Sequence, residues 1–317
     1  MPLRALVTRR LPASAVRILE EQVDVDMHAG DSGLTREELC SRVADKQALV
    51  VLLSDGVDAA VIDAAPQLKV IANVAVGFDN IDVAHARSKG IVVTNTPDVL
   101  TDATADLTWA LILAVTRRIG EGERIVRRGA WRGWSFEFML GSSLAGKQLG
   151  IVGPGRIGRA VGARAAAFGM TLAYAGRCPT DWAGAEAMSL DRLLSTSDVV
   201  SLHVPLTGQT RHLIDQRAFA RMKRTAYFVN TTRGSVVDES ALVWALREHL
   251  IAGAALDVFE REPEVHAGLL ELENVVLTPH LGSATRETRT AMAELAARNV
   301  IAVLEGAPPL TPVLLPR

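Results

Sequence analysis

Three side chains in the second half of the chain have types that could together carry out chemistry on an anionic carbonyl compound. Arg233 supplies a fixed cation, Glu262 a carboxylate and His280 a titratable imidazole. A keto or hydroxy acid needs a cation that anchors its carboxylate and polarises its carbonyl. It also needs a group that exchanges a proton near neutral pH, and imidazole does this. A carboxylate beside that imidazole would orient the ring and stabilise its charged form.

Each of the three residues also has a plain structural explanation when it is taken alone. Arg233, next to Gly234, could form a loop salt bridge. Glu262 lies in a charged loop and could be a solvated surface carboxylate, and His280 could be a strand-end histidine bonded to backbone. The three residues together, in this order, favour the chemical interpretation more strongly than any one of them does alone.

The elements that must position these side chains are strands of a parallel sheet. Short apolar runs alternate with helical patterns through the second half of the chain, which is typical of α/β folds. Arg233, Glu262 and His280 each follow the carboxyl end of an expected strand, and ligands of open α/β sheets bind at that edge. The six expected strands are Gln148–Val152, Thr171–Tyr174, Val199–His203, Ala226–Asn230, Gly253–Asp257 and Val275–Thr278.

A glycine turn follows the first of these strands. Gly153, Gly155 and Gly158 have the spacing G-x-G-x-x-G between an apolar run and an alanine-rich helical segment, Arg159–Phe168. The first glycine allows a tight turn, the second lets the backbone approach a pyrophosphate, and the third lets helix and strand pack closely. The helix N-terminus then offers N–H groups to phosphates. A glycine-rich packing turn is the alternative, but the strand and helix context favours dinucleotide binding.

The first half of the chain predicts a second, smaller α/β unit. Expected strands are 3–7, 48–53, 70–74 and 91–94, with helices at 13–21, 35–44 and 83–89 between them. A long helix at 101–119 would bridge the two units, a looser passage at 124–146 carries several aromatic residues, and a last helix at 286–304 would return to the first unit. We therefore expect an α/β protein of two doubly wound parallel-sheet domains with a cleft between them: a Rossmann cofactor domain over 99–286, and a flavodoxin-like, discontinuous substrate domain over 1–98 plus 287–317.

Composition excludes several other classes of function. The chain has 317 residues, 49% hydrophobic and 22% charged, and its formal net charge is −2. This balance gives no electrostatic case for binding nucleic acid or an anionic membrane. We see no signal peptide, no apolar run long enough to span a membrane, and no metal-binding pattern. Cys40 and Cys178 lie far apart, which favours a reducing, cytoplasmic setting.

Over nearly its whole length the chain resembles the D-isomer-specific 2-hydroxyacid dehydrogenases. The resemblance is specific because several motifs occur in the same order. They are Val74-Ala75-Val76-Gly77-Phe78-Asp79-Asn80-Ile81-Asp82, the glycine turn, Leu202-His203-Val204-Pro205-Leu206, Asn230-Thr231-Thr232-Arg233-Gly234, Asp257-Val258-Phe259-Glu260 and Thr278-Pro279-His280-Leu281-Gly282-Ser283-Ala284-Thr285.

The resemblance implies a role for each matching position. His280 would be the acid/base, Glu262 its partner, and Arg233 the group that binds the substrate carboxylate and carbonyl. Backbone at Val76 and Gly77 would also hold the carboxylate, with Leu53 or Ser54 near the pocket. A homodimer is implied as well. The positions expected to contact the cofactor are Thr104, Gly153, Gly155, Arg156, Ile157, Gly158, Arg177, His203, Val204, Pro205, Thr231 and Asp257.

Within this family, the passage from Tyr174 to Pro179 and the Trp131…Trp134 region are similar to the glyoxylate/hydroxypyruvate reductases. NAD-preferring relatives usually place an Asp directly after the strand, where it binds the ribose 2′-hydroxyl. Here Ala175 occupies that place and Arg177 follows. An acid would repel a 2′-phosphate and an arginine attracts it, so we expect NADPH to be preferred, with NADH possible. Arg177 as a plain surface charge is the alternative.

One residue of the glycine turn departs from the family pattern. Pro154 stands where the family usually has a larger apolar residue, and proline donates no N–H. A phosphate contact would be lost if that amide normally made one. We expect binding to survive because Gly155, Arg156 and Ile157 keep their amides.

The expected activity is NADPH-dependent reduction of a small 2-keto acid, of the glyoxylate or hydroxypyruvate type, to the D-2-hydroxy acid. Two alternatives stay open. Some corepressors resemble this fold and keep the Arg, Glu and His, so the chain could be a nucleotide-sensing binding protein. It could also be a member of the family that acts on another 2-hydroxy acid.

Overall fold

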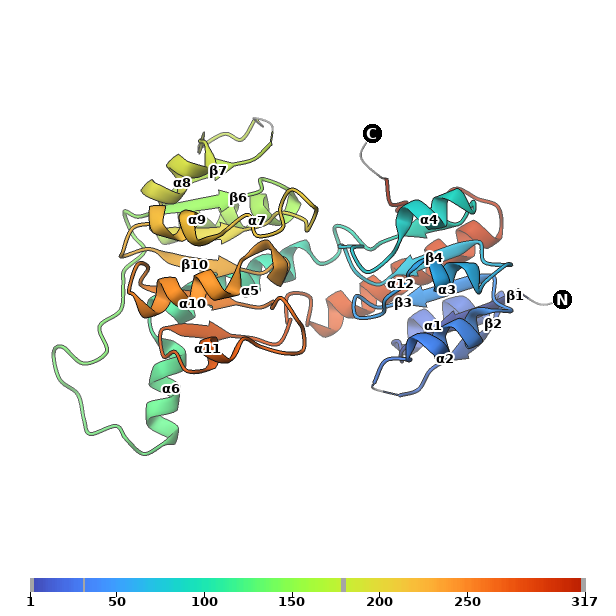
Figure 1. Cartoon of the computed structure of the whole chain (residues 1–317), viewed down its shortest axis with the longest axis horizontal. Helices are drawn as coiled ribbons and strands as arrows, with labels where there is room; N and C mark the ends of the chain where they lie inside the picture. The colour runs from blue at the N-terminus through green and yellow to red at the C-terminus, as the bar shows by residue number, and fades with distance from the viewer. Residues whose placement is uncertain (1–2, 31, 178–180, 315–317) are drawn as a thin grey trace. The chain divides into compact units, whose positions relative to one another are not determined.

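The computed structural model describes residues 3–30, 32–177 and 181–314, and Cys178 therefore lies outside the described residues. The described chain forms two compact units (Figure 1). Unit 1 contains the residues up to Leu100 together with those from Thr285 onward, and unit 2 contains Thr101–Ala284. These boundaries lie two residues from the expected ones. Which unit binds which ligand stays a prediction.

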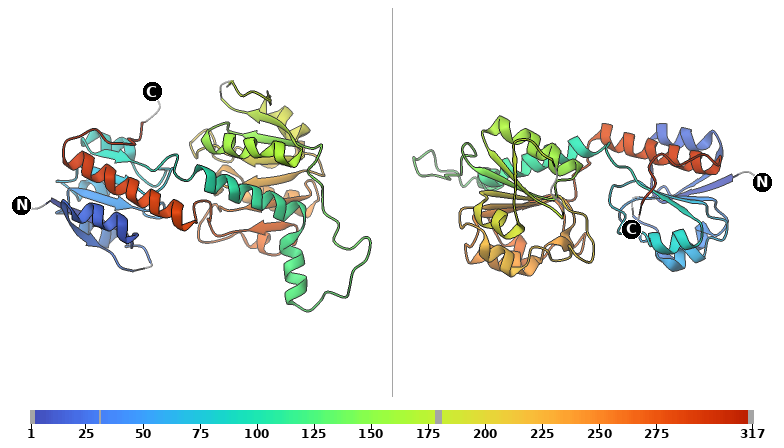
Figure 2. Two further views of the ribbon diagram at one scale, coloured as in Figure 1. Left: turned by 180° about the vertical axis from the view of Figure 1, so that it is seen from behind. Right: turned by 90° about the horizontal axis from the view of Figure 1, so that it is seen from above.

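Unit 1 is built on a five-stranded sheet in the order β2-β1-β3-β4-β5, in which every pairing is parallel. Helices α1 and α12 cover one face of the sheet, and α2, α3 and α4 cover the other (Figure 2). The order reverses between β1 and β3, as in flavodoxin-like sheets. Its elements are β1 (Leu3–Val7), α1 (Ala13–Glu20), β2 (Val23–Met27), α2 (Arg36–Val43), β3 (Ala48–Val51), α3 (Ala59–Asp63), β4 (Val70–Asn73), α4 (Val83–Ser88), β5 (Val92–Thr94) and α12 (Arg286–Leu304).

Unit 2 has a seven-stranded parallel sheet in the order β12-β11-β10-β9-β6-β7-β8. Helices α5 and α7 pack on one face, and α8, α9 and α10 on the other. Its elements are α5 (Thr101–Thr116), α6 (Ile119–Arg127), β6 (Gln148–Val152), α7 (Arg156–Ala165), η1 (Ala166–Phe168), β7 (Thr171–Ala175), β8 (Ala185–Ala187), α8 (Leu190–Thr196), β9 (Val199–Leu202), α9 (Gln216–Arg221), β10 (Tyr227–Asn230), η2 (Gly234–Val236), α10 (Glu239–Arg247), β11 (Gly253–Leu256), α11 (Ala267–Leu270) and β12 (Val275–Leu277).

The expected fold class, two parallel-sheet α/β domains, is confirmed, and both sheets have the buried strands that this class requires. Strands β3, β4, β9, β10 and β11 are buried at every position. Strands covered on both faces read as continuous apolar runs, and this explains why they can be recognised in the sequence.

Some elements were missed or misjudged. Strands β2 and β8 lie at sheet edges, and their polar composition hides them: β2 reads Val-Asp-Val-Asp-Met and β8 reads Ala-Glu-Ala. The expected helix over 101–119 is wrong at its end. Helix α5 stops at Thr116, and Arg118 adopts a left-handed φ of 55° before α6 starts. Among the described residues no helix is both long and apolar enough to cross a bilayer.

Candidate active site

His280 and Glu262 form a direct pair in unit 2. His280 Nδ1 lies 2.8 Å from Glu262 Oε2, and both side chains keep part of their surface exposed, 24% and 30% respectively. His280 comes just after β12 with a left-handed φ of 54°. Glu262 lies in the loop after β11. The two side chains, 18 residues apart in sequence, therefore meet at the carboxyl edge of neighbouring strands.

The surroundings of Glu262 favour its ionised form. Burial by itself would raise its pKa. The His280 ring, the Phe259 N–H and the positive charge of Arg233 outweigh burial and hold the pKa of Glu262 below its ordinary value. The Phe259 N–H donates to Glu262 Oε1 at 3.0 Å. Glu262 is thus an ionised acceptor with one oxygen on backbone and the other on imidazole.

Asp257 holds the segment that carries His280. Its carboxylate accepts hydrogen bonds from Thr278 Oγ1 at 2.6 Å, the Leu281 N–H at 2.7 Å and the Gly282 N–H at 2.8 Å. Burial raises the pKa of Asp257 despite these donors. The backbone carbonyl of Asp257 also accepts the His280 N–H at 2.9 Å. Asp257, which the resemblance places at the cofactor, therefore also holds the loop of His280.

Arg233 lies in a loop that Asn230 shapes from the end of β10. Asn230 is buried, its Nδ2 donates to the Arg233 carbonyl at 3.0 Å, and its Oδ1 accepts the Thr232 N–H at 3.0 Å. Arg233 lies close enough to Glu262 for its charge to lower the pKa of that carboxyl. The structure therefore brings Arg233, Glu262 and His280 together within unit 2, from three separate loops.

The glycine turn between β6 and α7 has the steric properties that its spacing predicts. Gly153 has a φ of 98°, and a Cβ there would lie 2.6 Å from the His203 carbonyl oxygen. A Cβ on Gly158 would lie 2.3 Å from the Gly153 oxygen, whereas a Cβ on Gly155 would meet nothing within 4 Å. Gly153 and Gly158 thus allow close packing of the backbone, whereas Gly155 lies next to open space.

One amide of this turn already has a partner inside the turn. The Gly155 N–H donates to the Gly153 carbonyl at 2.9 Å, so that amide is used inside the turn. The first turn of α7, from Arg156 and Ile157 onward, has no side-chain cap. Pro154 presents its carbonyl to Arg159 Nε at 3.2 Å. An anion at this helix start would meet the uncapped first amides of α7, and a contact of Gly155 with the cofactor stays a prediction.

Several of the other positions expected to contact the cofactor have described surroundings in unit 2. Thr104 is buried, and its hydroxyl donates to the Gly282 carbonyl at 3.2 Å. Thr231 shares a 3.1 Å hydrogen bond with Thr108. His203, followed by Val204 and Pro205 after β9, is neutral because burial lowers its pKa to about 3. Its Nδ1 is a buried polar atom for which the described residues supply no hydrogen-bond partner.

The end of β7 has the composition that bears on cofactor choice. The strand ends at Ala175, which is buried, and Arg177 is exposed two residues later. No acidic residue lies between them. Positions 178–180 lie outside the described residues, and they include the last two residues of the similar passage, Cys178 and Pro179.

The candidate substrate residues of unit 1 follow β3 and β4. The Val76 carbonyl accepts from Asn95 Nδ2 and the Gly77 carbonyl from Asn73 Nδ2, each at 2.8 Å. Leu53 has 37% of its surface exposed. Ser54 lines a cavity of about 460 Å³ within unit 1.

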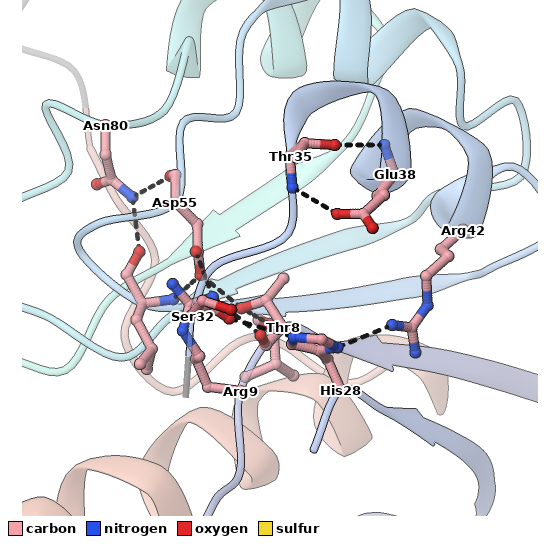
Figure 3. A network of polar contacts seen from close by, with 11 residues as sticks. Thr8, Arg9, His28, Ser32, Thr35, Glu38, Arg42, Asp55 and Asn80 are labelled. Atoms are coloured by element: carbon pink, nitrogen blue, oxygen red, sulfur yellow. Dashed lines mark hydrogen bonds and ion pairs between the residues drawn. The ribbon is translucent and has the colours of Figure 1, made fainter. Parts of the chain in front are cut away.

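A polar network that the sequence did not reveal shapes the loop of Leu53 and Ser54 (Figure 3). Asp55 is buried and accepts from Thr8 Oγ1 at 2.5 Å and from Arg9 Nη1 at 2.9 Å. Asn80 Nδ2 donates to the carbonyls of Leu52 at 3.1 Å and Asp55 at 3.0 Å. No pattern in the sequence distinguishes Asp55 as a buried aspartate paired with Arg9.

Two contacts near Arg233 and Glu262 were also missed. A Cβ on Gly234 would lie 1.8 Å from the Phe259 carbonyl carbon, so the two loops touch through backbone. Glu239, in the first turn of α10, is buried and bonded to the loop of Glu262. Only the glycine next to Arg233 could have suggested such a contact in advance. No group of three or more side chains suited to hold a metal ion occurs within residues 3–30, 32–177 and 181–314.

Comparisons with known proteins point to one family. The NAD binding domain of the D-isomer specific 2-hydroxyacid dehydrogenases matches residues 109–282. A glyoxylate reductase of Thermococcus onnurineus is 49% identical over 316 residues, which cover 97% of this chain and 95% of that protein.

Solved structures agree over the same extent. A protein from Thermus thermophilus is 49% identical, with a TM-score of 0.94 and coverage of 98% of this chain and 100% of that one. An NADPH-dependent glyoxylate/hydroxypyruvate reductase from Sinorhizobium meliloti, solved with NADP and malonate, is 35% identical, with a TM-score of 0.89 and coverage of 99% and 97%. The chain belongs to the D-isomer specific 2-hydroxyacid dehydrogenase family and is an NAD(P)-dependent oxidoreductase.

Proposed function

We propose that the protein reduces a small 2-keto acid of the glyoxylate or hydroxypyruvate type to the D-2-hydroxy acid, with NADPH preferred. The observation that carries the proposal is the His280–Glu262 pair beside Arg233 in the unit that also holds the glycine turn. The names of the similar proteins support the substrate class, since two of them are glyoxylate or glyoxylate/hydroxypyruvate reductases.

The residues around the glycine turn fit a dinucleotide. Gly153 and Gly158 leave no room for a Cβ, while the space around Gly155 is open. The first turn of α7 has no side-chain cap, so its amides and its positive dipole end suit a pyrophosphate. When bound, the nicotinamide cofactor supplies the hydride. Arg156 and Ile157 would lie at the phosphates, and Thr104, Val204, Pro205, Thr231 and Asp257 along the remainder of the cofactor.

The protein's own groups supply anchoring and the proton. Arg233 binds the substrate carboxylate and polarises the keto oxygen with its charge. His280 donates a proton from its imidazolium to that oxygen as the alcohol forms. Glu262, ionised and held by the Phe259 N–H, orients the ring through Nδ1 and stabilises its cationic form. Substrate binding by unit 1 stays a prediction from the resemblance, which assigns it to Leu53, Ser54, Val76 and Gly77.

The preference for NADPH rests on the end of β7. A buried Ala175 replaces the acid that would repel a 2′-phosphate, and the exposed Arg177 offers it a cation. The Sinorhizobium meliloti relative, named as NADPH-dependent, supports this assignment.

The direct test follows NADPH oxidation at 340 nm with a panel of small 2-keto acids. We expect turnover with glyoxylate or hydroxypyruvate. His280→Gln should lower kcat by about 100-fold or more, because a positioned acid/base contributes roughly 10²–10⁴ in rate, while NADPH binding changes little. Tight nucleotide binding without turnover of any 2-keto acid would overturn the proposal in favour of a nucleotide sensor. Turnover restricted to a different 2-keto acid would revise the substrate class.

We also propose that the protein is a homodimer, with a second copy of this chain covering the segment after α6. Helix α6 has no buried residue, and the chain that follows it leaves the body of unit 2 as a long loop (Figure 1). Its aromatic side chains are highly exposed, Trp134 and Phe136 at 81% each and Trp131 at 58%. Several large apolar side chains exposed in one segment favour a protein–protein contact there, and the family resemblance favours a second copy as the occupant.

A further inference from the structure

Two carboxyl side chains form a pair of their own beside the candidate acid/base pair. Glu239 and Glu260 exchange hydrogen bonds in both directions. The Glu260 N–H donates to the Glu239 side chain at 2.7 Å, and the Glu239 N–H donates to Glu260 Oε1 at 2.9 Å. Glu239 is in the first turn of α10, and Glu260 is two residues before Glu262. We call this reciprocal pair the carboxyl clasp.

Two more contacts fasten the same loop. The backbone at Gly234 lies against Phe259 and Glu260 so closely that a Cβ would overlap them. His212 Nε2 lies 3.1 Å from Glu260 Oε2, and the His212 N–H donates to the Ser235 carbonyl at 2.9 Å. The loop that bears Glu262 is therefore tied to the segment that follows Arg233 at three places.

The clasp binds the peptide next to the one that holds Glu262: the Glu260 N–H donates to Glu239, and the N–H of the preceding residue donates to Glu262. Phe259 precedes Glu260, and its N–H is the donor to Glu262 Oε1 at 3.0 Å. The other oxygen of Glu262 meets His280. A shift of the 259–260 backbone would therefore move the donor that orients the Glu262 carboxylate, and the carboxylate orients the imidazole.

Helix capping does not explain why Glu239 is buried. The N-cap of α10 is Asp238, whose side chain already accepts the Ala241 N–H at 3.0 Å. Burial of a carboxyl group is unfavourable unless its bonds compensate for it. The pKa of Glu239 is raised, chiefly because the group is buried and also because the charge of Glu260 lies nearby. The Glu260 N–H and the charges of His266 and Arg261 oppose this shift.

We propose that Glu239 and Glu260 are positioning residues for the reaction: the carboxyl clasp sets the backbone that orients Glu262, and through it His280. This inference rests on the proposed function for its effect on turnover. Its geometric part concerns only the ionisation of Glu262, which can be measured without any turnover.

The test compares Glu239→Ala, Glu239→Gln and the matched control Ser240→Ala, an exposed position on the same helix. We expect Glu239→Ala to lower kcat by roughly 10- to 100-fold, the scale for a displaced catalytic group, with the KM for NADPH unchanged. Glu239→Gln keeps an oxygen for the Glu260 N–H and should recover most of the activity. Ser240→Ala should behave as the wild type.

The second readout is a carbon-13 NMR titration of the Glu262 carboxyl, assigned with Glu262→Gln. We expect Glu239→Ala to raise the pKa of Glu262 toward its ordinary value, because the Phe259 donor is displaced. An unchanged Glu262 titration and unchanged kcat in Glu239→Ala would overturn the proposal. If the wild type turns over no keto acid but the titration still shifts, the clasp stands and the proposed function fails. If Glu239→Ala does not fold, Glu260→Ala, which removes the acceptor of the Glu239 N–H, is measured in the same two ways, and the same two shifts are expected.

Discussion

At the scale of single residues, the candidate site depends on groups whose ionisation is controlled by their neighbours. Glu262 is held ionised by His280, the Phe259 N–H and Arg233 against the effect of burial. Asp257, one loop away, has more burial and a raised pKa, although three donors contact it. Two carboxyl groups at one sheet edge thus differ in their readiness to lose a proton, which suits different tasks.

The pH dependence of stability should reveal the Glu262 interaction. The pKa of Glu262 is lower in the folded state than its ordinary 4.5, so its contribution is present above about pH 4.5 and is lost as the pH falls through the folded value. Glu262→Gln should therefore melt at a lower temperature than the wild type at pH 7, and the difference should shrink toward pH 3. The melting temperatures of both proteins are measured by circular dichroism during thermal unfolding at each pH. A difference that is constant across this range would contradict the assignment.

Cofactor choice is also a property of one residue. Arg177→Asp replaces the exposed cation after β7 with an anion, which would repel a 2′-phosphate. We expect the KM for NADPH to rise by about 10-fold or more, the loss of a charge-assisted contact, while the KM for NADH changes little. Steady-state kinetics with both cofactors decides it, with Arg192→Asp, another exposed arginine of unit 2, as the control. An equal effect on both cofactors would show that Arg177 is an ordinary surface charge.

At the scale of elements, loops after parallel strands build the site, and backbone packing between those loops sets its geometry. Asn230 shapes the loop after β10, Asp257 holds the loop after β12, and the carboxyl clasp fixes the loop after β11. Gly234 is where the first of these loops touches the third.

Two glycines of unit 2 should therefore respond in opposite ways to the same substitution. Gly234→Ala forces a Cβ into the Phe259 backbone, and we expect a loss of about 1–3 kcal/mol of stability, as for overpacking, together with reduced kcat. Gly155→Ala places its Cβ in open space with an ordinary φ of −77°, so stability should hold while the KM for NADPH rises. Denaturant unfolding and kinetics measure both. Wild-type stability in Gly234→Ala would show that the two loops can separate without cost.

At the scale of the whole molecule, the long loop after α6 gives unit 2 an apolar surface that one chain does not cover. The double variant Trp134→Asp with Phe136→Asp should convert the proposed dimer to a monomer, because it puts two charges into the apolar contact. Size-exclusion chromatography with light scattering gives the mass. Leu270→Asp, at an isolated exposed leucine of α11, is the matched control. A wild type with the mass of one chain would refute the dimer.

Residue types and their spacing along the chain predict the architecture and the candidate reacting groups. Buried parallel strands are continuous apolar runs, the glycine spacing marks the turn, and Arg233, Glu262 and His280 follow strand ends, so each can be recognised locally. Polar edge strands such as β2 and β8 lack that signal and were missed.

How those groups are held follows from the packing of the folded chain. The carboxyl clasp, the contact of Gly234 with Phe259, the bonds of Asp257 and the internal use of the Gly155 amide all join residues by distance and direction. Hydrogen bonds form only within a narrow range of length and angle. No pattern of residue types along the chain encodes that range, because it results from the packing of loops that are far apart in sequence.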